Sequence, residues 1–359
     1  MKAKKLFSIL LAVALTLSLF AGCGGSGSTT STTTAGSDTG SGTSTGTAAP
    51  TDETVTIKMG GIYADETGES QAMYKFKELV ESKSDTIKVD VYTNCLLGSE
   101  EVQTDAVRQG SLQMAVTGTT WASYLPYVAI GEYAFLFNGW DHAKAALTDP
   151  EIIADLSEGI EDYGAIAMGL NPAGFRVISS NKPIESMADF QGFRLRVPNI
   201  AQYVTMAECL GTNAITMAMT EIFTSLEQKV VDGQENAPST IIANKYYEVQ
   251  KYIIVTDHML TAHLWTINSD FYNTLSDTQK DVIQSCVTEA IDWCWDYYMS
   301  SEESDLAYLK EQGLTVTYPS DEFAAAMRQS MVDGGYADWF EEQYPGSGAI
   351  VETIKNYQY

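Results

Sequence analysis

The sequence predicts an α/β fold with mainly parallel sheets, and the regular alternation of helices and strands is the first reason. Residues 55–59 and 87–92 alternate as strands do, and residues 70–82 between them carry apolar side chains at helical spacing. Two further helix-then-strand passages follow, at 101–109 with 112–116 and at 151–161 with 165–170. Such alternation is typical of layered α/β architectures. The globular part, about Val55 to Tyr359, is long enough for one large or two medium domains.

A long helix is the second reason for this fold class, and it suggests two lobes. Residues 276–279 form a capping box, and periodic apolar residues continue to about Gln312, before Gly313. A helix of this length spans roughly 55 Å, which exceeds the diameter of a small domain. Either it kinks near residues 300–301 or it runs across two lobes. A cleft between two lobes would suit a small-molecule site.

The N-terminus, residues 1–22, is interpreted as an export signal. Three lysines precede an apolar run of about fifteen residues, which is shorter than the roughly twenty that a membrane span needs. The ending Phe-Ala-Gly-Cys resembles the lipobox of bacterial lipoproteins, which implies that Cys23 becomes a lipidated N-terminus and anchors the protein to the membrane. The alternative is an ordinary secreted protein with a chance cysteine.

Residues 23–53 are expected to form a lipid-anchored tether. They are rich in Gly, Ser and Thr and hold almost no large apolar residue, so they cannot bury enough surface to offset the entropy of ordering. A GxSxG pattern at 42–46, typical of serine hydrolases, lies in this segment with no strand before it and no helix after it. We interpret this pattern as a coincidence of low complexity.

Charge and composition exclude several classes of function. The formal net charge is −26, and removal of a leader with three lysines and no acid makes it more negative, so nucleic-acid binding is not expected. The cysteines after Cys23 show no CxxC spacing and are expected to be free thiols. The three histidines form no ligand-spaced cluster, so we expect no metal site and no cofactor.

Clustered arginines indicate a carboxylate receptor. Arg176, Arg194 and Arg196 are three of the five arginines in this acidic chain, and residues 232–236 follow with the sequence Asp-Gly-Gln-Glu-Asn. A guanidinium offers a fixed fork of donors that matches a carboxylate, whereas lysine offers a flexible point charge. Residues 193–197 read as a strand that places Arg194 and Arg196 on one face.

Several motifs in this region resemble those of the DctP-type substrate-binding proteins of tripartite ATP-independent periplasmic (TRAP) transporters. The motifs are Gly-Phe-Arg at 174–176, Asp-Phe-Gln-Gly-Phe-Arg-Leu-Arg-Val-Pro-Asn at 189–199, Glu-Ile-Phe-Thr-Ser-Leu-Glu-Gln at 221–228 and Val-Asp-Gly-Gln-Glu-Asn at 231–236. The resemblance implies a two-lobed, periplasmic-binding-protein-like fold, with a ligand cleft between the lobes and a long helix spanning both. It assigns 54–173 and 262–301 to lobe I, and 174–261 and 302–359 to lobe II.

The resemblance also implies the site residues. Arg196 would pair with the ligand carboxylate, Arg176 would supply a second cation, and Asn236 would donate hydrogen bonds to the ligand. Arg194 is expected to be a solvated charge. From the residues alone, Arg176 could instead pair with Asp189 or Glu185, and Asn236 could cap the helix that follows it.

Three further positions are carried over with the family's pattern. Met219 stands where many relatives have a stacking Phe, so the pocket floor is expected to differ. His263 and Trp121 align with positions that contact the ligand in some relatives. No catalytic residue is implied.

The expected function is that of an extracytoplasmic solute-binding lipoprotein, which is monomeric, captures a small organic acid by hinge closure and delivers it to separate TRAP permease subunits. One alternative is a ligand sensor or surface protein of the same fold; another is a surface hydrolase with paired carboxylates. The acid is left open among C4-dicarboxylates, uronates and other sugar acids, keto acids and aromatic acids. Met219, together with the lack of an obvious extra cation in lobe I, favours a monocarboxylate or sugar acid.

Overall fold

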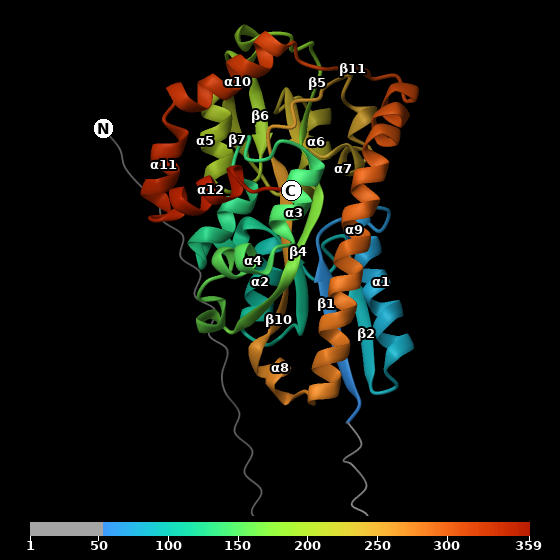
Figure 1. Ribbon diagram of the computed structural model, residues 1–359. Helices are drawn as coiled ribbons and strands as arrows, with labels where there is room; N and C mark the ends of the chain where they lie inside the picture. The colour runs from blue at the N-terminus through green and yellow to red at the C-terminus, as the bar shows by residue number, and fades with distance from the viewer. Residues whose placement is uncertain (1–52) are drawn as a thin grey trace, which may run out of the picture. The chain divides into compact units, whose positions relative to one another are not determined.

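The computed structural model describes residues 53–359 (Figure 1). The predicted signal at 1–22, the lipid site at Cys23 and nearly all of the tether at 23–53 lie outside these residues. Among the residues described, no helix is both long and apolar enough to cross a bilayer.

The first lobe is built on a five-stranded sheet in the order β2-β1-β3-β10-β4. Its strands are β1 (Val55–Gly61), β2 (Ile87–Tyr92), β3 (Met114–Thr117), β4 (Ala165–Phe175) and β10 (Leu260–Asn268). β1 pairs in parallel with β2 and β3, in a register that places Val55 opposite Ile87. β10 alone runs antiparallel to its neighbours β3 and β4. The crossover helices after β1 and β2 are α1 (Gly68–Lys83) and α2 (Glu100–Arg108).

The second lobe is built on a six-stranded sheet in the order β11-β9-β5-β8-β6-β7. Its strands are β5 (Val177–Ser180), β6 (Arg194–Val197), β7 (Asn213–Thr216), β8 (Gly233–Asn236), β9 (Tyr252–Ile254) and β11 (Thr315–Thr317). Only β5 runs antiparallel to its neighbours. Each sheet therefore contains a single reversed strand, which agrees with the prediction of mainly parallel sheets.

Three segments connect the two lobes. β4 passes into β5 through the single residue Arg176, and residues 255–259 lead from β9 back to β10. The third is α9 (Asp277–Glu311), which packs against α1 and β4 of the first lobe and against α7 (Pro238–Ala243) and β11 of the second (Figure 1). The helix is continuous, so of the two sequence alternatives the helix across two lobes is correct. The predicted capping box is present, with Ser276 and Gln279 each bonding the other's backbone.

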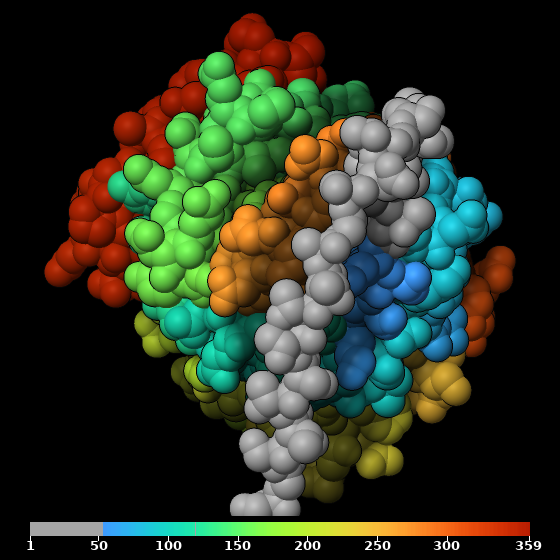
Figure 2. Space-filling view, turned by 90° about the horizontal axis from the view of Figure 1, so that it is seen from below, coloured from blue at the N-terminus to red at the C-terminus, as the bar shows by residue number. Residues whose placement is uncertain are grey.

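The remaining helices complete the outer layers. They are η1 (Thr119–Ser123), η2 (Pro126–Glu132), α3 (Trp140–Leu147), α4 (Pro150–Leu156), η3 (Ile160–Tyr163), η4 (Met187–Phe190), α5 (Ala201–Cys209), η5 (Met219–Glu221), α6 (Ile222–Glu227), η6 (Tyr246–Glu248), α8 (Ser269–Thr274), α10 (Asp321–Asp333), α11 (Tyr336–Gln343) and α12 (Ser347–Lys355). Seen from below, the surface of α8 and the start of α9 lies between the 150–170 segment and the β1–β2 segment (Figure 2).

The C-terminal helices contact both lobes. α10 and α11 pack against α5 of the second lobe, whereas α12 packs against α4 and η2 of the first. Val351 and Ile354 are the buried apolar positions of α12, and the Ile354 carbonyl lies 2.8 Å from His142 Nε2. The sequence-based boundary gave all of 302–359 to the second lobe, but this last helix buries its apolar face on the first.

Candidate ligand-binding site

A cavity of about 350 Å³ lies between the two lobes and draws its wall from both. The first lobe contributes Tyr63, Glu100, Glu132 and His263, and the second contributes Arg176, Arg196, Tyr203, Met219 and Asn236, among others. Five of the six predicted ligand contacts therefore line one cavity. A volume of this order suits a small metabolite.

Arg196 is buried in the cavity wall without a counter-ion. It lies in β6 and is 3% exposed. Its Nε and Nη2 atoms donate to the Met217 carbonyl at 3.2 and 2.7 Å, and no carboxylate within residues 53–359 forms an ion pair with it. Burial lowers the pKa of Arg196 to about 10, because the charge of Glu235 offsets only part of the desolvation and Arg176 adds repulsion.

Arg176 is also buried but fully neutralised. Its Nη2 atom donates to Glu235 Oε1 at 2.8 Å, its Nε atom donates to Glu235 Oε2, and its Nη1 atom donates to Thr261 at 2.7 Å. Burial opposes the charged form, yet the carboxylate of Glu235 outweighs it and raises the pKa of Arg176. The alternative in which Arg176 pairs with Asp189 or Glu185 is wrong, because its ion-pair partner is Glu235, and the Asp189 carboxylate accepts from the backbone of residues 185 and 186 instead.

Glu235 is fully buried at the lobe junction. Besides the two bonds from Arg176, it lies 3.4 Å from His258 Nε2, while His258 Nδ1 contacts Thr256 at 2.7 Å. Burial penalises the ionised carboxyl, but the charge of Arg176 and the bond from His258 keep the pKa of Glu235 below its ordinary value. Sequence reasoning missed this residue, although it stands inside the Gln-Glu-Asn motif.

Asn236 ends β8 and lines the cavity beside the arginines. Its Nδ2 atom donates to Gln234 Oε1 at 2.6 Å, and Gln234 in turn donates to Ser179 at 2.9 Å. The capping alternative is wrong, because α7 begins after Ala237 and has no side-chain cap bond. The amide of Asn236 is thus held by its neighbours within the second sheet.

Arg194 is separate from the site. Its guanidinium forms two bonds to the Asp232 carboxylate, at 2.6 and 3.1 Å, and its side chain is 40% exposed. The prediction of a solvated charge is confirmed by this exposure. The ion pair with Asp232 explains why a residue on the same strand as Arg196 does not share its environment.

His263 lies in the first-lobe wall and forms a second buried ion pair, with Glu69. Its Nδ1 atom lies 2.6 Å from Glu69 Oε2, and its ring stacks on Tyr63 with centroids 5.4 Å apart. Desolvation opposes protonation, but Glu69 and, to a lesser extent, Glu100 and Glu132 raise the pKa of His263 to about 9. No sequence signal pointed to Glu69, which begins α1 some two hundred residues earlier.

Two further carboxylates line the first-lobe wall and were missed by sequence reasoning. Glu100 accepts from the Gly118 amide at 2.6 Å and from the Thr120 hydroxyl at 3.3 Å. Glu132 accepts from the Tyr203 hydroxyl at 2.7 Å and from the Ala262 amide at 3.3 Å. Since Glu132 lies in η2 and Tyr203 in α5, this hydrogen bond joins the two lobes.

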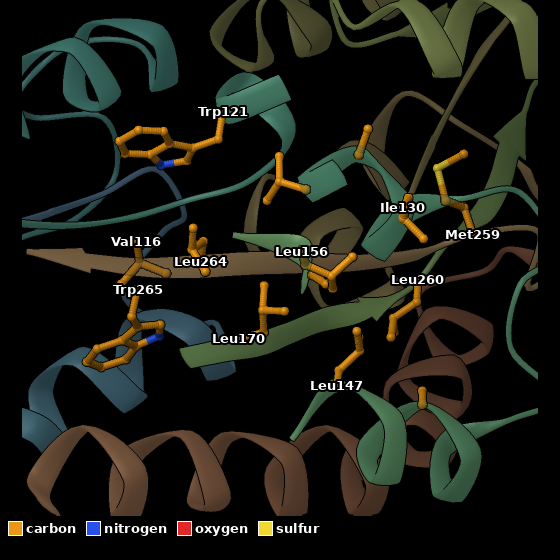
Figure 3. Close-up of a cluster of buried hydrophobic side chains, with 14 of the residues drawn as sticks. Val116, Trp121, Ile130, Leu147, Leu156, Leu170, Met259, Leu260, Leu264 and Trp265 are labelled. Atoms are coloured by element: carbon orange, nitrogen blue, oxygen red, sulfur yellow. The ribbon is translucent and has the colours of Figure 1, made fainter. Parts of the chain in front are cut away.

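Trp121 does not line the cavity, which corrects the expectation that this residue contacts the ligand. The side chain belongs to a cluster of buried side chains (Figure 3). Its indole donates to Thr117 at 3.1 Å. It meets Tyr124 edge to face, with centroids 6.2 Å apart. The neighbouring Thr120 faces the cavity instead. Alignment to a family motif cannot tell whether Trp121 or the adjacent Thr120 points into the cavity.

Within the described part of the chain, no group of His, Cys, Asp and Glu side chains could hold a metal ion. The four cysteines within residues 53–359 are free, and two of them, Cys286 and Cys294, are buried in α9.

Comparisons with known proteins show what this chain is similar to. The model of the bacterial extracellular solute-binding proteins, family 7 (DctP), matches residues 59–343. The sialic acid-binding periplasmic protein SiaP of Vibrio cholerae is 29% identical over 297 residues, which cover 78% of this chain and 88% of that protein. A TRAP periplasmic solute-binding protein from Haemophilus influenzae with bound L-gulonate is 30% identical, with a TM-score of 0.79, over 83% of this chain and 98% of its own.

A second solved structure is similar to the same extent. The sugar acid binding protein DctPAm of Advenella mimigardefordensis, in complex with galactonate, is 28% identical, with a TM-score of 0.80, over 84% of this chain and 98% of its own. The family match covers most of the chain, and the two-lobed fold is shared with these neighbours. This chain therefore belongs to the DctP family of bacterial extracellular solute-binding proteins.

Proposed function

We propose that this chain is the extracytoplasmic binding component of a TRAP transporter, which captures a small organic acid in the cavity between its lobes and delivers it to separate permease subunits. One observation carries the proposal, namely that Arg196 is a buried guanidinium in the cavity wall with no carboxylate partner among residues 53–359. The relatives named above bind sialic acid, L-gulonate and galactonate, all of which carry a carboxylate.

Electrostatics favours an anion at Arg196. A buried charge without a counter-ion is costly, and a ligand carboxylate would supply the missing charge together with a bidentate hydrogen-bond pattern. The two bonds from Arg196 to the Met217 carbonyl use its Nε and Nη2 atoms. Asn236, which lines the same cavity, would donate to the same carboxylate or to an adjacent hydroxyl.

We propose that the protein closes around its ligand because both lobes contribute to the cavity wall. The wall of the cavity comes from both lobes, so a ligand makes all of its contacts only when they are together. A ligand shifts the equilibrium between open and closed forms only as far as its affinity for the two differs. The Glu132–Tyr203 hydrogen bond is one contact that would form on closure.

The leader and Cys23 support a place outside the cytoplasm. We propose that residues 1–22 direct export, that Cys23 carries lipid, and that residues 23–53 tether a monomeric binding unit to the membrane. Replacement of Cys23 by Ser should release the protein from the membrane fraction. Mass spectrometry that finds an unmodified Cys23 in the mature protein would contradict the anchor.

A thermal-shift screen of an organic-acid library tests the function. A ligand at 100 times its dissociation constant stabilises the folded state by roughly 2.7 kcal/mol, which raises the melting temperature measurably. Binding should saturate, leave the ligand unchanged and disappear in Arg196→Ala. If neutral sugars shift the melting temperature and no acid does, the carboxylate proposal is wrong, and a product released from a bound glycan or ester would favour a hydrolase.

A further inference from the structure

The charges around the cavity are not balanced between the two lobes. Arg176 is neutralised by Glu235, and His263 is paired with Glu69. The wall also holds Arg196 on the second lobe and the carboxylates of Glu100 and Glu101 on the first, while Glu132 accepts hydrogen bonds from Tyr203 and Ala262. One lobe therefore presents a cation to the cavity, and the other presents excess negative charge.

Glu100 is fixed in this wall as a hydrogen-bond acceptor. It opens α2 directly after the capping Ser99, where the helix N-terminus favours negative charge, although burial raises the pKa of the Glu100 carboxyl. The Gly118 amide, at 2.6 Å, and the Thr120 hydroxyl, at 3.3 Å, both donate to Oε1. The backbone of Gly118 lies close to this carboxylate, because a Cβ there would lie 2.5 Å from His263 Cδ2 and 3.2 Å from Glu100 Oε1.

A second ligand carboxylate would be unfavourable beside this wall. A like charge near Glu100 would meet this fixed acceptor, the neighbouring carboxylate of Glu101 and no unpaired cation among the lining residues of the first lobe. A hydroxyl would instead donate to these carboxylates. Hydroxyl and amide groups of Thr216, Thr220 and Asn199 also line the cavity, and such groups both donate and accept as hydroxyls do.

An ammonium group is less well matched than hydroxyls. Recognition of cations commonly uses the face of an aromatic ring. Of the two cavity tyrosines, Tyr63 has one face stacked on His263, and Tyr203 has one face under the guanidinium of Arg176, 5.0 Å from its ring centroid. Each of these rings already serves a protein cation.

We propose that the cavity selects a monocarboxylate that carries several hydroxyl groups, and that Glu100 is a specificity-determining residue that rejects a second carboxylate at the far end of the ligand. This inference rests on the proposed function, since it takes the first carboxylate to bind at Arg196. It excludes the C4-dicarboxylates and favours acids of the aldonate and uronate type.

Calorimetric titration of the full mature chain with matched ligands tests the selection. The panel holds C5 and C6 aldonates and uronates, together with the aldarate of each, in which a second carboxylate replaces the terminal group. It also holds unhydroxylated acids, such as hexanoate and succinate, and 2-amino-2-deoxy aldonates. The tightest hydroxylated monocarboxylate should bind at least about ten-fold more tightly than its aldarate. Its affinity should also exceed that of the unhydroxylated acids and that of the 2-amino-2-deoxy aldonates by a similar factor.

The other possible results of this titration contradict either the proposed selectivity or the proposed function. If an aldarate, succinate or hexanoate binds as tightly as the best hydroxylated monocarboxylate, this inference is wrong while the carboxylate receptor stands. If an amino aldonate binds best, the wall selects a cation and the inference is again wrong. If no acid of the panel binds, this inference is wrong, and the proposed function fails as well only if no acid of the thermal-shift library binds. If only acids bind that are indifferent to Arg196→Ala, the proposed function itself fails.

The variant Glu100→Gln tests the residue. It keeps an acceptor for the Gly118 amide but removes the charge, so affinity for the aldarate should rise relative to the aldonate by roughly ten-fold. Glu78→Gln, which removes a carboxylate that is 75% exposed on α1, controls for net charge and should leave the ratio unchanged. An unchanged ratio in folded Glu100→Gln overturns the role of Glu100. The comparison of ligands on the unaltered protein remains decisive if that variant does not fold.

Discussion

The guanidinium of Arg176 and the carboxylate of Glu235 form a buried ion pair at the point where β4 passes into β5. The pair is completed by Thr261 and His258, so three of the four side chains come from the two short crossings between the lobes or a strand that flanks them, and Glu235 comes from β8, which pairs with β5. Because Glu235 neutralises Arg176, the neighbouring Arg196 is left as a buried cation of the cavity wall with no carboxylate partner among residues 53–359. We therefore propose different roles for the two arginines of the motif, with Arg176 holding the junction of the lobes and Arg196 binding the ligand.

Arg196→Met should abolish tight binding without destabilising the unliganded protein. Charge-assisted hydrogen bonds contribute roughly 1.5 to 3 kcal/mol, so affinity should fall by about 10- to 150-fold. Replacement of a buried, unpaired charge by an apolar chain of similar length should leave the free energy of unfolding equal or higher. Titration calorimetry and urea unfolding measure the two effects.

The matched control is Arg194→Met, on the same strand but 40% exposed and paired with Asp232. It should change affinity little. Equal loss of affinity in both variants would show that the arginines act only through the overall field, and a large loss of stability in Arg196→Met would show that the guanidinium holds the fold.

Glu235→Gln should destabilise the protein strongly, because it leaves Arg176 buried without its counter-ion. Loss of one partner of a buried ion pair costs about 3 to 5 kcal/mol. Asp232→Asn removes the partner of half-exposed Arg194 and should cost at most about 1 kcal/mol. Urea unfolding of the two variants gives the comparison, and similar small losses in both would contradict a structural role for the Arg176–Glu235 pair.

The sequence predicted the elements whose signals are local. The long helix was found because a capping box at Ser276 and a helix-stopping Gly313 bracket an uninterrupted apolar period, and the helix runs from Asp277 to Glu311. The strand that carries Arg196 was found from its alternation. Its placement in the cavity followed from the motif and not from periodicity, since alternation gives Arg194 the same face.

The sequence could not predict contacts between residues distant in the chain. Glu235 and Arg176 are fifty-nine residues apart, and the sequence offered nearer acids as partners for Arg176. His263 and Glu69 are farther apart still, and each of these pairs forms only because β10 and β8 return to positions beside earlier strands. Trp121 shows a different limit of the sequence. The aligned position was correct to within one residue, since Thr120 lines the cavity, but the side chain of Trp121 is buried in the core.

Tyr203→Phe should shift the protein toward an open form. The hydroxyl of Tyr203 donates to Glu132 across the cleft at 2.7 Å, and its loss removes a bond that joins the two lobes. A hydrogen bond to a charged group contributes roughly 1.5 to 3 kcal/mol, so affinity for any ligand should fall by about ten-fold or more. Small-angle scattering of the unliganded variant should show a larger radius of gyration.

Tyr124→Phe provides the control for that experiment. Its hydroxyl donates to Asp105 at 2.7 Å, but both residues belong to the first lobe. This variant should leave affinity and the scattering profile unchanged. If both tyrosine variants behave alike, the cross-cleft bond does not contribute to closure.

The stability of the unliganded protein should fall between about pH 6.5 and pH 9 because of His263. Glu69 at 2.6 Å helps to raise the pKa of His263 from 6.5 to about 9, so the protonated form is favoured in the folded state. The resulting stabilisation is complete below the unfolded pKa and is lost as pH rises through about 9. A displacement of this size corresponds to roughly 3 kcal/mol. Urea unfolding at pH 6, 7.5 and 9 gives the slope, which should be smaller in His263→Gln, and identical slopes in the two proteins would show that His263 is not protonated when folded.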